Sequence, residues 1–184
     1  MQLFTRRTAP VALALVALCG MVLYFEGRIG WCKYGFSLWS PAWSRCTSQN
    51  LFDPYTFSHL LHGVIFYWLL RWLAPNWPLA WRLIAAMTIE VAWELLENSP
   101  PIIERYRQTT ASLDYTGDSI LNSLSDVAAA VAGFAIASRT GWKTALAMFA
   151  GLELLALLIA RDNLTLNVLM LIWPIESIKD WQTM

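Results

Sequence analysis

Residues 90–98 read E-V-A-W-E-L-L-E-N, and the rest of the chain is organised around this stretch. Glu90, Glu94 and Glu97 recur at positions i, i+4 and i+7, which places three carboxyl groups on one face of a helix. The residues just before them, 79–89, are almost all apolar. The stretch is therefore typical of the end of a membrane-spanning helix that carries acid. Ionisable groups in such helices are costly and usually functional.

The composition favours an integral membrane protein with one domain, residues 1–184. Hydrophobic residues make up 57% of the chain and charged residues 14%, whereas soluble domains carry about 25% charged residues. The 13 basic and 13 acidic residues cancel, and the lack of a basic stripe argues against a nucleic-acid partner. The 11 Trp and 6 Tyr are suited to membrane interfaces, so membrane lipids are the expected surroundings.

Long apolar segments predict an all-α, polytopic transmembrane helix bundle. The fourth segment carries Ala129, Gly133 and Ala137 at every fourth position, a spacing that lets another helix approach closely. The stretch Leu164 to Pro174 is apolar but too short to cross a membrane, so it is expected to be interfacial or re-entrant. The five expected spans are residues 9–25, 57–73, 79–96, 119–138 and 144–160.

Basic residues near the ends of the spans predict the orientation. Arg6 and Arg7 precede the first span, which is interpreted as uncleaved because its apolar run is long for a signal peptide. The connections around residues 71–82 and 139–143 are short and contain basic but no acidic residues. By the positive-inside rule, the N-terminus and these two turns are expected in the cytoplasm.

The first outer loop, residues 26–55, then lies outside the cytoplasm, where disulfides persist. It contains Cys32 and Cys46, which are predicted to form a disulfide; the alternative is two unpaired cysteines. Closing a loop of this size would contribute roughly 3 kcal/mol.

Polar residues of the second, third and fourth spans match one another in depth. Consecutive spans alternate in direction, and a helix rises about 5.4 Å per turn. This spacing predicts a polar pocket that opens to the outer leaflet beneath both outer loops. Its three expected layers, from the outside inward, are His59, Glu97 and Asp118, then His62, Glu94 and Asn122, then Glu90 and Asp126.

Each of these residues also has a structural interpretation. His59 suits the headgroup level, Asp118 suits a helix cap, and Glu97 suits a solvated interface. Arg105 has three alternatives, which are an ion pair with Glu97, a contact with lipid phosphate, or exposure to water. Four residues lie inside apolar stretches, which favours a functional or network role for them: His62, Glu90, Glu94 and Asp126.

Four motifs in this order resemble a family of small bacterial inner-membrane proteins of unknown function. They are S-H-L-L-H-G at 58–63, E-V-A-W-E-L-L-E-N at 90–98, E-R-Y-R at 104–107 and Y-T-G-D-S-I-L-N-S-L-S-D at 115–126. The likeness extends from the first span through the fourth. It implies a multi-pass protein of the bacterial plasma (inner) membrane without an assigned activity.

A fainter similarity points to the VanZ-like glycopeptide-resistance membrane proteins. Those proteins carry a His in one span, a Glu-rich helix end in the next, an Arg, and then an Asp and an Asn that open a following span. This chain differs by its second histidine, its long cysteine loop and its paired prolines. The residues that match the pattern are His62, Glu94, Arg105, Asp118 and Asn122.

Three classes of function remain open. The first is an intramembrane enzyme that acts on a lipid-linked or headgroup substrate, with His62, Glu94, Asp118 and Asn122 as its catalytic residues. The first three of these could instead hold a divalent metal, the candidate cofactor, or act as acid and base. No H-E-x-x-H or nucleophile motif identifies a reaction. The residues assigned to a surrounding polar network are His59, Glu90, Glu97, Arg105 and Asp126.

The other two classes need no reaction. One is a proton or cation binding or transport module, although the chain is short for a transporter and shows no internal repeat. The other is an assembly or scaffold protein, in which a buried polar network only specifies how the helices pack. The substrate, the identity of the metal and the oligomeric state stay open at this point.

Overall fold

A computed structural model of the chain describes residues 2–110 and 114–183, and these residues fold into helices and loops. The expected all-α class is confirmed, and the described residues contain only one isolated β-bridge, between Trp39 and Phe52. Five helices are long and three are short. In chain order they are α1 (Thr8–Phe25), α2 (Thr56–Leu73), α3 (Leu79–Glu97), α4 (Pro100–Thr109), α5 (Ile120–Ala137), α6 (Trp142–Ala160), α7 (Leu164–Ile172) and α8 (Glu176–Thr183).

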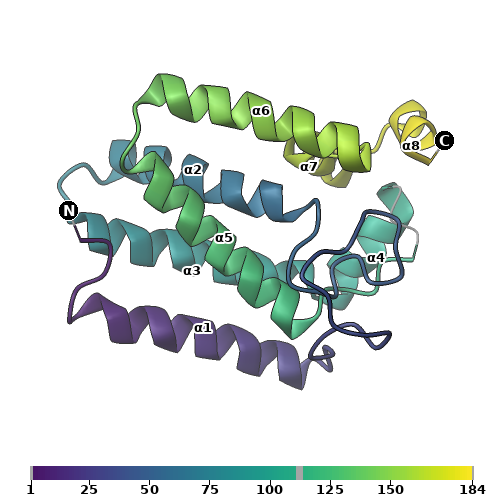
Figure 1. The fold of residues 1–184 in the computed structure, drawn as a ribbon, viewed down its shortest axis with the longest axis horizontal. Helices are drawn as coiled ribbons and strands as arrows, with labels where there is room; N and C mark the ends of the chain where they lie inside the picture. The colour runs from purple at the N-terminus through teal and green to yellow at the C-terminus, as the bar shows by residue number, and fades with distance from the viewer. Residues whose placement is uncertain (1, 111–113, 184) are drawn as a thin grey trace.

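The five long helices alternate in direction along the chain, as Figure 1 shows. Helix α5 contacts α1, α2 and α3, while α6 packs on α2. The N-terminus and the turns at 74–78 and 138–141 therefore lie at one end of the bundle (Figure 1). The loop at 26–55 and helices α4, α7 and α8 gather at the opposite end. Both long connections thus cover the same end of the bundle, as the alternating spans predict.

Helices α2 and α5 approach closely because each has a glycine at their crossing. A Cβ atom added at Gly63 would lie 1.9 Å from the carbonyl oxygen of Ala130, and one added at Gly133 would lie 1.9 Å from that of Leu60. Ala129 and Ala137 are buried on the same face of α5. The small-residue spacing in the sequence is therefore used for the contact with α2, which carries both histidines.

Three helices, α1, α5 and α6, are long and apolar enough to cross a membrane. Helices α2 and α3 were also expected to cross but do not meet the same criterion of length and composition. Helix α3 contains Arg82 and three glutamates, and α2 contains two histidines and Arg71. Average hydropathy counts these polar side chains against a helix even where they face other helices.

The chain after α6 is helical, with a turn between α7 and α8. Glu153 in α6 accepts hydrogen bonds from the backbone N–H groups of Leu164 and Thr165, at 2.9 and 3.1 Å. These are among the N–H groups that a helix start leaves without an intrahelical acceptor. The segment expected to be interfacial or re-entrant is thus a nine-residue helix, α7, held against α6. Helix α8 follows it at the end of the described chain.

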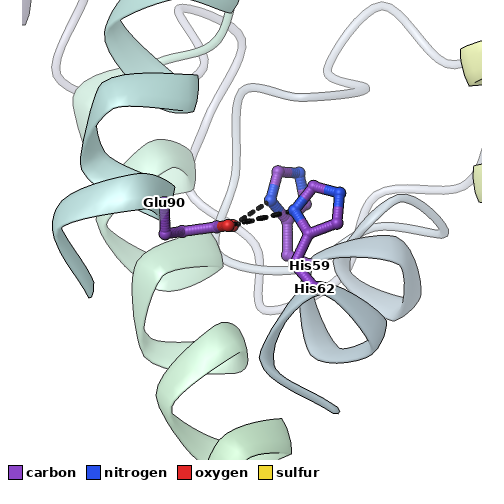
Figure 2. A group of neighbouring side chains, drawn as sticks. All are labelled: His59, His62 and Glu90. Carbon is purple, nitrogen blue, oxygen red and sulfur yellow. Dashed lines mark hydrogen bonds and ion pairs between the residues drawn. The ribbon is translucent and has the colours of Figure 1, made fainter. Parts of the chain in front are cut away.

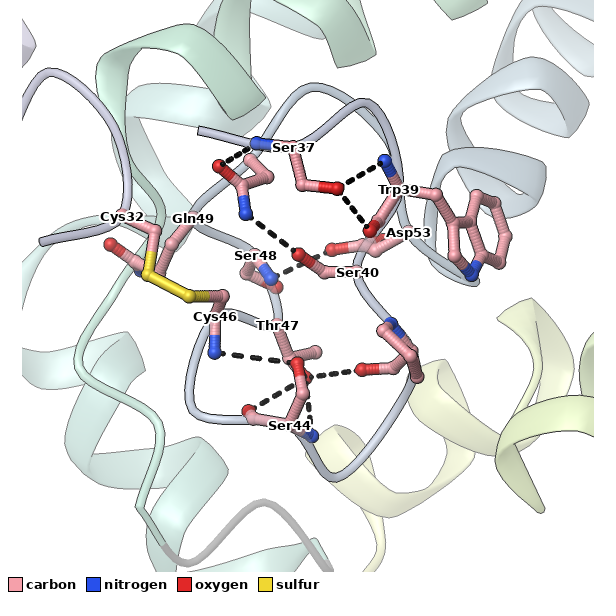
Figure 3. Close-up of a disulfide and its surroundings, with 12 residues drawn as sticks. Cys32, Ser37, Trp39, Ser40, Ser44, Cys46, Thr47, Ser48, Gln49 and Asp53 are labelled. Atoms are coloured by element: carbon pink, nitrogen blue, oxygen red, sulfur yellow. Dashed lines mark hydrogen bonds between the residues drawn. A yellow bond between two sulfur atoms is a disulfide. The ribbon is translucent and has the colours of Figure 1, made fainter. Parts of the chain in front are cut away.

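The loop at 26–55 is folded back on itself, as Figure 3 shows. The structure joins Cys32 to Cys46, with Cα atoms 5.5 Å apart. Asp53 accepts hydrogen bonds from the backbone N–H groups of Ser48 and Tyr55, both at 2.8 Å. These bonds fix the segment that leads directly into α2.

The same loop caps the start of α5. The backbone N–H groups of Ser119, Ile120 and Leu121 donate to loop carbonyl groups at Ser48, Ile29 and Gly30, at 2.9–3.1 Å. Deeper in the bundle, the Ser125 hydroxyl donates to the carbonyl oxygen of Leu51. The chain before α2 therefore runs along the first turns of α5, and this sets the depth at which α2 begins.

Candidate functional site

Two imidazoles share one buried carboxylate at the centre of the site (Figure 2). His59 and His62 lie one turn apart on α2, and Glu90 comes from α3. The Nδ1 atom of His59 lies 2.7 Å from Glu90 Oε1, and that of His62 lies 3.0 Å from Oε2. Glu90 is fully buried. Because an ionised carboxylate only accepts hydrogen bonds, Glu90 favours the proton on Nδ1 of each imidazole, and the lone pair of a neutral imidazole is then on Nε2.

Two further carboxylates lie against His59. Glu94 Oε1 is 3.2 Å from His59 Nδ1, and Asp126 Oδ2 of α5 is 4.0 Å from its Nε2. Glu94 is 0% exposed and Asp126 is 2% exposed. Among the described residues, no hydrogen-bond donor reaches either carboxylate oxygen of Glu94, and none reaches Oδ1 of Asp126. Acidic groups therefore outnumber donors at this point, which is unusual because buried polar atoms are normally satisfied.

The histidines and Asp126 line a cavity of about 1000 Å³ at the end of the bundle covered by the loops. Glu90 and Glu94 do not line it and lie behind the imidazoles. One side of the cavity is apolar and comes from α2, α3 and α7. Basic side chains of the loop, Lys33 and Arg45, form part of the wall, each over the ring of Tyr34. The apolar residues of the wall include Phe66, Ile89, Trp93, Leu164 and Val168.

Asp118 belongs to a second polar group at the start of α5. It accepts hydrogen bonds from Asn98 Nδ2 at 3.1 Å and from the Tyr115 hydroxyl at 3.0 Å. Its own backbone N–H donates to Asn98 Oδ1 at 2.6 Å. Burial, reinforced by the negative charges of Glu97 and Asp53, raises the pKa of Asp118 to about 8. Asp118 is therefore a neutral acid below that pH.

Glu97 and Arg105 are directed to other partners. The Tyr106 hydroxyl lies 2.8 Å from Glu97 Oε1 and 3.1 Å from Asn167 Oδ1, which ties α3 and α4 to α7. Arg105 Nε donates to the carbonyl oxygen of Leu171 at 3.0 Å. Of the two residues, only Glu97 lines the cavity. Neither the pair of Arg105 with Glu97 nor a cavity position for Arg105 is seen among the described residues.

The structure thus divides the sequence-predicted residues into two groups. His59, His62, Glu90, Glu94 and Asp126 lie together, while Asp118 is bonded to Asn98 and Tyr115. Asn122 lines the same cavity and is almost fully buried. The described residues contain two groups able to hold a metal ion, namely His59, His62 and Glu90, and His59, Glu94 and Asp126. The sequence predicted His62, Glu94 and Asp118 as the metal ligands. Of these three, only Glu94 belongs to the group with His59 and Asp126, so the predicted ligand set is not brought together.

Sequence reasoning missed several residues that shape the site. Asn98, which was not among the predicted site residues, is fully buried and bridges Asp118 and Ser123. Its position four residues after Glu94, on the same helix face, was the available signal. Tyr115 comes three residues before Asp118 in the Y-T-G-D motif, but no periodicity links a loop tyrosine to a helix start.

Comparison with known proteins shows a family profile and several relatives that match most of the chain. The family profile described as "Protein of unknown function (DUF2585)" matches residues 23–184. A UPF0314 protein of Brucella anthropi is 51% identical over 176 residues, which cover 95% of this chain and 90% of that protein. A UPF0314 protein of Sphingopyxis alaskensis is 51% identical over 174 residues, covering 94% of this chain and 93% of its own.

The UPF0314 protein Atu8092 of Agrobacterium fabrum is 48% identical over 176 residues, covering 94% of this chain and 88% of its own. No solved structure matches the chain. These comparisons do not show the similarity to VanZ-like proteins. They do confirm the resemblance to a family of unknown function: the chain is similar to UPF0314 proteins along most of its length and belongs to the DUF2585 family.

Proposed function

We propose that this protein is a multi-pass enzyme of the bacterial inner membrane that performs acid–base chemistry on the headgroup of a lipid or lipid-linked substrate. Five long helices would span the membrane, with the cavity open to the periplasmic leaflet. The polar faces of α2 and α3 turn toward each other and toward α5 rather than toward lipid, as the contacts among His59, Glu90 and Asp126 indicate. This arrangement lowers the cost of placing ionisable groups in the membrane.

The observation that carries the proposal is the shared carboxylate. With Glu90 as the acceptor of an Nδ1 proton from both imidazoles, a neutral His62 would have the lone pair of Nε2 available, and His62 lines the cavity. An imidazole oriented by a carboxylate is the usual arrangement of a general base, because the carboxylate fixes the tautomer and stabilises the imidazolium that forms. His62 Nε2 would take the proton of a water or hydroxyl nucleophile and return it to the leaving group.

The walls of the cavity suit an amphiphile with an anionic headgroup. Lys33 and Arg45 supply positive charge at the loop side, whereas Phe66, Trp93 and Val168 supply an apolar surface. A cavity of about 1000 Å³ is large enough for a headgroup and part of an acyl or prenyl chain. A water-soluble substrate would leave the apolar side unused, so the lipid-linked substrate is preferred.

A deletion strain tests this function. Loss of the gene should cause one envelope lipid or lipid-linked intermediate to accumulate, as measured by mass spectrometry of membrane extracts. Plasmid-borne wild-type protein should restore the profile, and so should Gly151→Ala, a matched control in open space on α6. His62→Gln should not restore it although the protein is present at normal abundance.

Two outcomes would count against the enzyme. An unchanged lipid profile in the deletion strain would rule out a lipid or lipid-linked substrate. Full restoration of the profile by His62→Gln would rule out His62 as the general base. In the second case the buried network acts only in helix packing, and the protein is an assembly or scaffold protein.

A further inference from the structure

The buried carboxylates around His59 lack the partners that ionised groups need. Glu94 offers two oxygens without a hydrogen-bond donor, and Asp126 offers Oδ1 without one. Within the described part of the chain, the ion pairs of these two residues involve only His59. Among the described residues, no Lys or Arg forms an ion pair with either of them, and the ion pair that involves an Arg joins Arg107 to Glu104 on the surface of α4.

Removing a carboxylate from water costs several kcal/mol unless a partner compensates. The Nδ1 atom of His59 is already paired with Glu90 at 2.7 Å, and its Nε2 atom lies 4.0 Å from Asp126, beyond hydrogen-bond distance, so this imidazole leaves the two further acidic groups unsatisfied. A bound cation can, because it takes oxygen atoms from several carboxylates at once. The unsatisfied oxygens are nearly fully buried and come from two different helices, α3 and α5, that flank one imidazole.

The geometry suits a single ion. One ligand atom from each of His59, Glu94 and Asp126 lies within 4.8 Å of the other two. Tetrahedral ligands at about 2.1 Å from a metal are about 3.4 Å apart, so side-chain rotations alone can close the site. His59 and Asp126 line the cavity while Glu94 closes the site from behind, so a fourth position would face the cavity. Asn122, whose Nδ2 has no acceptor among the described residues, lies on the same wall.

The ligand set selects the class of ion. One imidazole nitrogen with two carboxylate oxygens is typical of Zn²⁺ and related transition-metal ions, whereas Mg²⁺ and Ca²⁺ prefer oxygen ligands alone. Three protein ligands with one open position are also the pattern of catalytic rather than structural zinc. We propose that His59, Glu94 and Asp126 bind one divalent transition-metal ion, with Zn²⁺ as its representative, at the inner wall of the cavity.

This inference deepens the function proposed above, since the ion would lie beside the His62–Glu90 pair and would polarise a headgroup oxygen or a water. It differs from the sequence-based hypothesis in its ligands. His59 replaces His62 and Asp126 replaces Asp118, which leaves His62 free to act as the base.

The test measures metal binding directly. The full-length protein is purified in detergent through a tag without histidine, stripped with a chelator, and titrated with ZnCl₂ in a calorimeter. The wild-type protein should bind one equivalent. Glu94→Gln and Asp126→Asn should each weaken the affinity by at least about 100-fold, because each removes a ligand. Glu104→Gln, which alters an exposed carboxylate on α4, should bind as the wild type does.

Cobalt provides a second readout. Co²⁺ bound at the site should give visible absorption bands in the wild-type protein that are lost in His59→Gln, even if Glu94→Gln fails to fold. The inference is overturned if the wild-type protein binds neither ion below millimolar concentration, or if the ligand variants bind as tightly as the wild type. If the protein binds metal but its deletion leaves the lipids unchanged, the metal site is supported and the proposed enzymatic function is overturned. If the protein converts a lipid but binds no metal, the enzymatic function is supported and the metal site is overturned.

Discussion

The crossing of α2 and α5 gives the sharpest test of how the site is assembled. Gly63→Ala would place a Cβ atom 1.9 Å from the Ala130 carbonyl oxygen and 2.6 Å from the Phe134 nitrogen. Both obstacles are backbone atoms, so no side-chain rotation relieves the clash. Since ordinary contact begins near 3.4 Å, the two helices must separate locally by about 1.5 Å. Gly63 follows His62 directly, so the displacement moves the histidines relative to Asp126.

The magnitude follows from two opposing effects. Replacing glycine by alanine inside a helix contributes up to about 1 kcal/mol of stability. Overpacking of a core costs about 1–3 kcal/mol, and more when backbone must move. The clash at Gly63 is with backbone on both sides, so the cost should reach the upper value and exceed the gain by about 2 kcal/mol. For a chain of this size, this corresponds to a fall in melting temperature of roughly 4–8 °C.

Circular dichroism of the detergent-solubilised protein measures this change. Gly151→Ala is the matched control, because it makes the same substitution in a long helix where nothing lies within 4 Å. Its melting temperature should equal or slightly exceed that of the wild type. A Gly63→Ala protein as stable as Gly151→Ala would refute the close crossing, and with it the placement of the histidines beside α5.

Three further results are expected. The raised pKa of Asp118, about 8 against 3.8 when unfolded, means that the folded state holds an extra proton between these values. The free energy of unfolding should therefore fall by roughly 1 kcal/mol per pH unit as the pH rises from about 4 to 8. Denaturant titrations at pH 5 and 7.5 should show a smaller fall for Asp118→Asn than for the wild type. An equal fall in both proteins would contradict this. Reducing the Cys32–Cys46 disulfide should lower stability by about 3 kcal/mol, whereas reductant should leave a double Cys→Ser variant unaffected. Reporter fusions after Pro75 should be cytoplasmic and those after Ser48 periplasmic, and the opposite pattern would move the cavity to the inner leaflet.

The sequence predicts the helices and the residues of the site better than their register. Spacing along each helix was sufficient to expect that His59, His62, Glu90, Glu94 and Asp126 face one pocket. The expected depths assumed that all spans begin at one level, which placed His59 two turns away from Glu90. The structure instead pairs them at 2.7 Å.

The physical reason for the shift lies in the loop. Because the Ser125 hydroxyl of α5 donates to the Leu51 carbonyl, the chain enters α2 below the start of α5. His59 therefore meets Asp126 rather than Asp118. A tertiary contact made by one loop carbonyl has no periodic signature, so no reading of single helices could supply it.

Membrane spans show the converse difficulty. By length and composition alone, α1, α5 and α6 are apolar enough to cross a membrane. Helices α2 and α3 carry most of the candidate site, and its polar residues also lower their average hydropathy. The prediction that α2 and α3 cross the membrane depended on the turns between them and on the alternating direction of the helices, and it remains part of the proposed function.

Conversion of the accumulated lipid by the purified protein tests the central claim most directly. The species that builds up in the deletion strain is incorporated into proteoliposomes with wild-type, His62→Gln or Gly151→Ala protein, and its loss is followed by mass spectrometry. The account predicts conversion by wild type and Gly151→Ala, and a rate lower by about 10²–10⁴-fold with His62→Gln, the usual contribution of a general base. Absence of conversion by the wild-type protein, or an equal rate with His62→Gln, would contradict it.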